Sequence, residues 1–145
     1  MYGGTFLFDN VPGFVKMMRE AADRGVHIRF LVGDPASVGV HQRGIEEGIG
    51  EALKGRCRMT LKHLEALREV EGVQIRTHGS PLYVSMFRAD EILYANHHIL
   101  GSAAGDNPVI EFTRDADEEL WEKYRNSYET IWDSATQAQY PMGSY

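Results

Sequence analysis

The stretch from Phe14 to Pro35 constrains the fold more than any other part of this 145-residue chain. Apolar residues between Phe14 and Ala22 recur at the spacing of an amphipathic helix, and Gly25 stands where such a helix commonly ends. Apolar and polar residues then alternate from Val26 to Val32, which is the period of a strand, before the turn residues Gly33-Asp34-Pro35. A helix that leads through glycine into a strand is typical of a βαβ unit, and so predicts an α/β fold.

The N-terminal segment extends this unit. Tyr2–Phe8 is aromatic and β-branched and predicts a strand, which begins so close to Met1 that we expect a fragment of a longer chain. We expect Val26–Val32 to be the central strand of a mixed sheet that has helices on both faces.

Later segments predict four more strands and a final helix. The strands are expected at residues 73–78, 82–88, 92–96 and 108–113, and the helix at residues 115–132. We interpret residues 1–133 as a single domain and residues 134–145, which show no periodicity, as a loose tail.

Glycines set residues 36–56 apart, because they interrupt an otherwise helical pattern. Each interior glycine costs a helix about 1 kcal/mol. The segment is therefore either a broken helix or a mobile cover over a site. A better helix follows, with apolar positions at Met59, Leu61, Leu64 and Leu67.

The composition excludes several classes of protein. The net charge of −6 does not suit nucleic-acid binding, which depends on neutralising phosphates. No apolar run could span a bilayer, and no signal peptide is evident, so we expect a cytoplasmic chain that does not bind membranes. The single cysteine, Cys57, is expected to be a partly buried helix residue.

Two segments resemble the phospholipase D superfamily. The first is the helix–strand unit from Ala21 to Pro35. The second follows the His-x-Lys-x₄-Asp motif of these enzymes and the Gly-Ser-x-Asn that comes after it. When Asp90 is placed on the motif's aspartate, Tyr83 takes the histidine position, Ser85 the lysine position and His98 the final asparagine position.

A second resemblance covers about residues 2–133. The chain is similar to an uncharacterised domain found C-terminal to Xre-type helix-turn-helix motifs in actinobacterial regulators. The matching features are Arg24-Gly25-Val26, Gly33-Asp34-Pro35, Glu46-Glu47-Gly48-Ile49-Gly50, the Tyr83–Arg88 strand, Asp90-Glu91, and Tyr124 with Trp132.

The phospholipase D resemblance implies a degenerate site. In the enzymes the histidine attacks phosphorus and the lysine holds the phosphoryl oxygens, whereas Tyr83 is a poor nucleophile and Ser85 carries no charge. We therefore expect no catalytic residues, no metal and no cofactor, but a pocket for a small polar or anionic ligand. The residues expected to line it are Asp34, His41, Arg43, Arg56, Tyr83, Ser85, Arg88, Asn96 and His98, with Arg76 as part of a positive rim.

Simpler interpretations remain open for these residues. Tyr83 could pack in the core, Ser85 could be an ordinary strand residue and Asp34 a turn residue before Pro35. The adjacent His97 and His98 face opposite sides of a strand, which disfavours a metal pair.

Three functions are compatible with this sequence. The first is a ligand-sensing domain of a transcriptional regulator. The second is a phosphodiesterase-like or other hydrolase with a rebuilt site, in which His41, His78 or His98 is the base. The third is a dimerisation module. Because phospholipase-D-like domains with one motif pair to build one site, the resemblance implies a homodimer.

Overall fold

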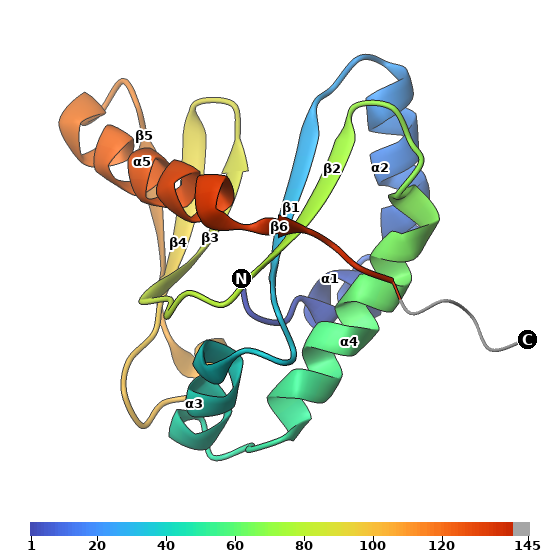
Figure 1. Ribbon diagram of the computed structural model, residues 1–145. Helices are drawn as coiled ribbons and strands as arrows, with labels where there is room; N and C mark the ends of the chain where they lie inside the picture. The colour runs from blue at the N-terminus through green and yellow to red at the C-terminus, as the bar shows by residue number, and fades with distance from the viewer. Residues whose placement is uncertain (141–145) are drawn as a thin grey trace, which may run out of the picture.

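A computed structural model describes residues 1–140 as a mixed α/β structure with two small sheets (Figure 1). In chain order its elements are α1 (Thr5–Asn10), α2 (Phe14–Asp23), β1 (Ile28–Gly33), α3 (Val38–Glu46), α4 (Ala52–Leu64), the 3-10 helix η1 (Glu65–Leu67), β2 (Val73–His78), β3 (Val84–Ala89), β4 (Ile92–His97), the 3-10 helix η2 (Ala104–Asp106), β5 (Val109–Thr113), α5 (Glu118–Ser134) and β6 (Thr136–Gln137).

The first sheet has the strand order β1-β2-β6 and is mixed. β1 and β2 are parallel and are joined through α3 and α4, while β6 runs antiparallel to β2. The expectation that Val26–Val32 forms the central strand is wrong, because β2 is central and β1 lies at the edge. The expected loose tail is also wrong for the residues after Ser134, since β6 pairs with β2 and Ala138 donates a backbone hydrogen bond to Ile75. Residues 141–145, the rest of that tail, lie outside the described residues.

The strand expected at Tyr2–Phe8 is a helix instead. Leu7 and Phe8 of α1 pack against the hydrophobic core, and Phe8 stacks on the His63 ring at 4.5 Å between ring centroids. Tertiary packing therefore overrides the strand preference of these aromatic residues. Only the first two residues lie along β1, where Gly33 N donates to Tyr2 O.

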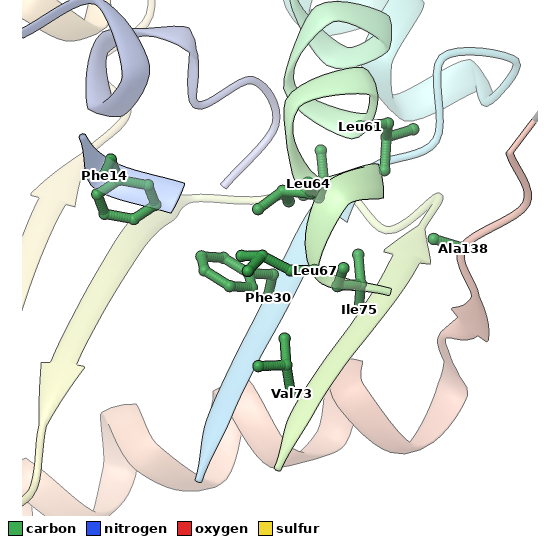
Figure 2. Close-up of a cluster of buried hydrophobic side chains, with 9 residues drawn as sticks. Phe14, Phe30, Leu61, Leu64, Leu67, Val73, Ile75 and Ala138 are labelled. Carbon is green, nitrogen blue, oxygen red and sulfur yellow. The ribbon is translucent and has the colours of Figure 1, made fainter. Parts of the chain in front are cut away.

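Helices cover both faces of the first sheet, as expected. On one face α2 and α4 contribute to a cluster of buried apolar side chains (Figure 2). The cluster comprises Phe14, Phe30, Val32, Leu61, Leu64, Leu67, Val73, Ile75 and Ala138. On the other face α5 lies over Arg29 and Arg76, whose guanidinium carbons are 5.0 and 4.5 Å from the centroid of the Trp132 ring.

The second sheet is antiparallel, with the order β3-β4-β5. Asp90, at φ 51°, forms the tight turn between β3 and β4, and this hairpin and β5 lie close to the predicted positions. α5 also covers one face of this sheet, where Leu93, Ala95 and Trp121 are buried together. The aromatic residues of α5 are thus covered within the chain itself.

The glycine-rich segment is a broken helix. α3 ends at Glu46, α4 begins at Ala52, and Gly48 and Gly50 between them have φ values of 71° and 51° that favour glycine. Within residues 1–140, none of the helices has the length and apolar character needed to cross a bilayer.

Candidate functional site

A serine and a histidine of the β3–β4 hairpin form the centre of the candidate site. Ser85 Oγ lies 2.9 Å from Nε2 of His98, and His98 Nδ1 lies 2.9 Å from the carbonyl oxygen of Leu82. Because that carbonyl can only accept, Nδ1 carries the ring proton and Nε2 is left to accept from the serine hydroxyl.

The register of the hairpin explains why these two residues meet. Ser85 pairs with Asn96, and His98 follows Asn96 by two residues, so both side chains emerge on one face of the sheet. The backbone of His98 is held as well, because its N–H donates to Tyr83 O at 2.8 Å.

Tyr2 joins the site from the other end of the chain. Its ring is stacked against that of His98, with 5.8 Å between ring centroids, and its hydroxyl accepts a 2.7 Å hydrogen bond from Leu82 N. Tyr2 therefore braces both the imidazole and the segment that supplies its carbonyl partner. Sequence reasoning missed this residue, because only folding brings it to the hairpin.

The electrostatics keep His98 uncharged at neutral pH. Burial lowers the pKa of the His98 imidazole to about 4, and the positive charge of Arg43 acts in the same direction. The ring is therefore unprotonated at neutral pH, and its Nε2 can accept the hydrogen bond from the Ser85 hydroxyl.

Arg43 of α3 is buried, with a side-chain exposure of 3%, and does not offer a free positive charge. Its Nε lies 2.7 Å from a carboxylate oxygen of Glu47, and its Nη1 lies 3.7 Å from Glu46. The Glu47 contact is poorly aligned for a hydrogen bond, and Nη2 has no hydrogen-bond partner within the described chain. Two carboxylates already offset the charge of Arg43, so the structure adds no support to the prediction that it brings charge to a ligand.

The other charged residues predicted on the glycine-rich segment, His41 and Arg56, are not arranged to bind an anion beside Ser85. His41 Nδ1 is 3.2 Å from a carboxylate oxygen of Glu51, on the solvent side of α3. Arg56 is exposed on α4. The expected cationic rim on this segment does not form.

Tyr83 lies beside the site without entering the core. It precedes β3, and its side chain is 80% exposed, which excludes the alternative of a packed core residue. Its position leaves the hydroxyl in solvent.

Two arginines expected in the site lie on the far side of their sheets, against α5. Arg88 is three residues from Ser85 and so emerges on the opposite face, where its guanidinium stacks over Trp121 at 5.2 Å from the ring centroid. Arg76 donates to the carbonyl oxygen of Trp132 at 2.8 Å. Neither arginine lies beside Ser85, because strand alternation places Arg88 on the opposite face of β3 and Arg76 belongs to the other sheet.

Asn96 and Asp34 have structural roles. The Asn96 amide donates to the carbonyl oxygens of Ala104 and Asn107, which ties down the loop after β4. Asp34 Oδ1 accepts from Ala36 N at 2.9 Å, the hydrogen bond of a turn residue. The turn interpretation of Asp34 is therefore the one that the structure supports.

A histidine and the cysteine are also buried, near β1 and β2. His78 Nε2 lies 3.1 Å from Met1 O, and burial lowers its pKa to about 4. Burial raises the pKa of the Cys57 thiol to about 12, which makes it unreactive, and its Sγ donates to Tyr2 O.

Two surface hollows lie away from Ser85 and His98. One, of about 260 Å³, lies along β2 and β6 between Arg68 and Tyr140, and the other, of about 470 Å³, lies at the starts of β1 and β2. Residues 1–140 contain no group of three or more His, Cys, Asp and Glu side chains arranged to hold a metal ion.

Comparison with known proteins finds no relative. No protein-family model matches the chain, and no curated protein or solved structure is significantly similar to it.

Proposed function

We propose that this chain is a ligand-sensing domain of a transcriptional regulator, with a phospholipase-D-like site that has lost the inherited catalytic residues. The observation that carries the proposal is the cluster in which Ser85 is hydrogen-bonded to His98 and Tyr2 stacks on the His98 ring. This cluster is assembled from the β3–β4 hairpin and the N-terminus, and α3 packs beside it.

The positions of the two hairpin residues support the phospholipase-D-like interpretation. Ser85 and His98 align with the lysine and the final asparagine of the enzyme motif, two residues that share one active site in those enzymes. Here they share one hydrogen bond. The exposure of Tyr83 and the division of the strands into two sheets do not add support.

The ligand that suits this site is polar and uncharged. Ser85 and His98 offer a hydroxyl and a neutral imidazole, and the charge of the buried Arg43 beside them is offset by Glu46 and Glu47. An anion placed there would meet a cation that is already paired and two carboxylates that repel it.

α3 is the element that a ligand would move. Gly39 packs so closely on the Gly79–Ser80 segment that a Cβ there would lie 2.7 Å from Gly79 O. Such a contact permits a closed position of α3 over the segment that joins β2 to β3, and a ligand that changed this contact would shift the balance between closed and open positions.

NMR tests the proposal. Small polyols, nucleosides, amino acids and phosphate are added one class at a time, and the chemical shifts of the backbone amides and imidazoles are recorded. We expect one uncharged class to shift Gly39, Ser85 and His98 together and to slow amide exchange across residues 38–46. Ser85→Ala should abolish these shifts, while Ser127→Ala on the exposed face of α5 should leave them unchanged. Shifts confined to the hollow between Arg68 and Tyr140, or no shifts with any class, would overturn it.

A homodimer is part of the same proposal, because single-motif phospholipase-D-like domains pair to complete a site. The α5 aromatic residues do not themselves demand a partner, since Trp121 and Trp132 are buried within the chain. Light scattering should give twice the chain mass of 16.4 kDa, and a clean monomer mass at high concentration would contradict pairing.

A further inference from the structure

We propose that Ser85 is a nucleophile activated by His98, and that the site cleaves esters with an uncharged, apolar acyl group. The inference concerns the site of the proposed function and rests on that site's being open to small molecules. It adds a chemical reaction to a site so far proposed only to bind.

The geometry is that of a serine nucleophile with its base. Such sites are recognised by a nucleophile and a base within about 2.6–3.2 Å, with a third group that orients the base. Ser85 Oγ and His98 Nε2 meet this distance at 2.9 Å, and the carbonyl oxygen of Leu82 is the third group, accepting from Nδ1–H. The carbonyl replaces the carboxylate of a Ser-His-Asp triad in orienting the ring and selecting its tautomer, without the negative charge.

The imidazole is both held and uncharged. Tyr2 stacks on its face, so the ring cannot turn away from Ser85 without displacing a buried side chain. Burial holds the pKa of His98 well below neutral, so the ring is unprotonated at physiological pH but is a weaker base than an exposed histidine.

The strand pairing supplies a donor for the oxyanion. His98 N donates to Tyr83 O, so Tyr83 and His98 form a hydrogen-bonded pair of the antiparallel ladder. Hydrogen-bonded and non-hydrogen-bonded pairs alternate along such a ladder, so Ser85 and Asn96 form the next hydrogen-bonded pair. The backbone N–H and C=O of Ser85 therefore face β4. The N–H of Met86 faces away from β4, towards the open edge of the sheet, because β3 is the outermost strand. The N–H of the residue after the nucleophile can then bind the oxyanion of an acyl intermediate.

The surroundings favour an apolar acyl group over a phosphodiester. Phe87 and Tyr94 form a cross-strand pair on the same face of the sheet as Ser85, and Val109 lies on that face opposite Asn96. Tyr94 and Val109 are exposed on this face, and the Glu111 carboxylate beside the Tyr94 hydroxyl would repel an anionic phosphodiester.

The reaction balances with water as the only co-substrate. Ser85 Oγ bonds to the acyl carbon, the bond to the alcohol oxygen breaks, and the serine proton passes through His98 Nε2 to the departing alcohol. Water then attacks the acyl carbon, the bond from that carbon to Ser85 Oγ breaks, and the water proton passes through His98 Nε2 to Ser85 Oγ as the carboxylic acid leaves.

An alkyl fluorophosphonate, which labels activated serine hydroxyls, tests the inference in the intact chain. Peptide mass spectrometry after labelling should find the adduct on Ser85 and none on Ser80 or Ser102, a comparison made within one folded sample. Ser85→Ala should remove the adduct, and His98→Gln should slow labelling at least about 100-fold, as expected for loss of a general base. Ser127→Ala is the matched control and should label at the unaltered rate.

Release of 4-nitrophenol from 4-nitrophenyl butyrate gives the second readout, with the same dependence on Ser85 and His98. Labelling of Ser85 no faster than of Ser80 and Ser102 would overturn the inference. If this occurred while small polar compounds still shifted the Ser85 and His98 resonances, the binding function would stand and only the nucleophile would be refuted. If neither preferential labelling of Ser85 nor shifts of the Ser85 and His98 resonances were found, the binding function would be refuted as well.

Discussion

Acid should destabilise this protein through His78. The imidazole is 2% exposed, and its burial, helped by the nearby amino group of Met1, lowers its pKa from 6.5 to about 4. The folded state therefore binds fewer protons than the unfolded state between these two values, and the free energy of unfolding falls as the pH falls through that window. No change from His78 is expected above about pH 7.

The size of the effect follows from the two pKa values. One pKa unit corresponds to about 1.4 kcal/mol, so the unfolded state gains about 2 kcal/mol at pH 5 and about 3 kcal/mol at pH 4 from protonating this one group. His98 adds to the same slope, but by less than its pKa suggests, because its ring is only partly buried and solvent screens it.

Urea unfolding at a series of pH values from 7 to 4 measures this dependence. His78→Gln removes the titrating group and keeps a donor for Met1 O. Between pH 7 and pH 4 the free energy of unfolding should therefore fall by about 3 kcal/mol less in this variant than in the parent protein. The exposed His27→Gln variant should keep the full dependence of the parent. NMR titration of the His78 ring in the parent gives an independent value, and a pKa near 6.5 there, or equal slopes for parent and His78→Gln, would refute the reasoning.

The remaining predictions concern the α3–α4 segment and are measured by urea unfolding at neutral pH. Gly44→Ala should lower the free energy of unfolding by about 2 kcal/mol, because the added Cβ would overlap a backbone carbonyl of the turn after α3. Gly55→Ala, which has open space around it within α4, should instead raise the free energy of unfolding by about 1 kcal/mol. Equal effects of the two substitutions would contradict the tight packing of α3. Arg43→Met should cost about 3–5 kcal/mol, because it leaves the Glu47 carboxylate buried without its partner, and a second change of Glu47 to leucine should recover most of the loss.

Local sequence patterns predicted the helices and strands that are determined by the spacing of their own apolar residues and by adjacent turn residues. The alternation from Val26 to Val32 matches β1, and Gly25 ends α2 with a φ of 87°, as expected of a glycine after a helix. The β3–β4 hairpin was predicted for the same reason, because alternation on both sides of a short turn specifies pairing and register together.

Tyr2–Phe8 shows where local pattern fails. Its aromatic residues have a strand preference, but a helix at Thr5–Asn10 lets Leu7 and Phe8 reach the core, and packing decides between the two. β6 was missed for the opposite reason: Thr136–Gln137 is too short to show a period, and only the presence of β2 gives it a partner.

For the candidate site, the sequence by itself determined that Ser85 and His98 could share a face of a hairpin, because their separation follows from turn and register. Only the tertiary structure brought Tyr2 onto the imidazole, placed α5 over Arg88 and Arg76 and paired Arg43 with Glu46 and Glu47. The physical reason is that strand periodicity acts between near neighbours. Burial, ion pairing and the resulting pKa values depend on which distant segments pack together, and no local pattern encodes that choice.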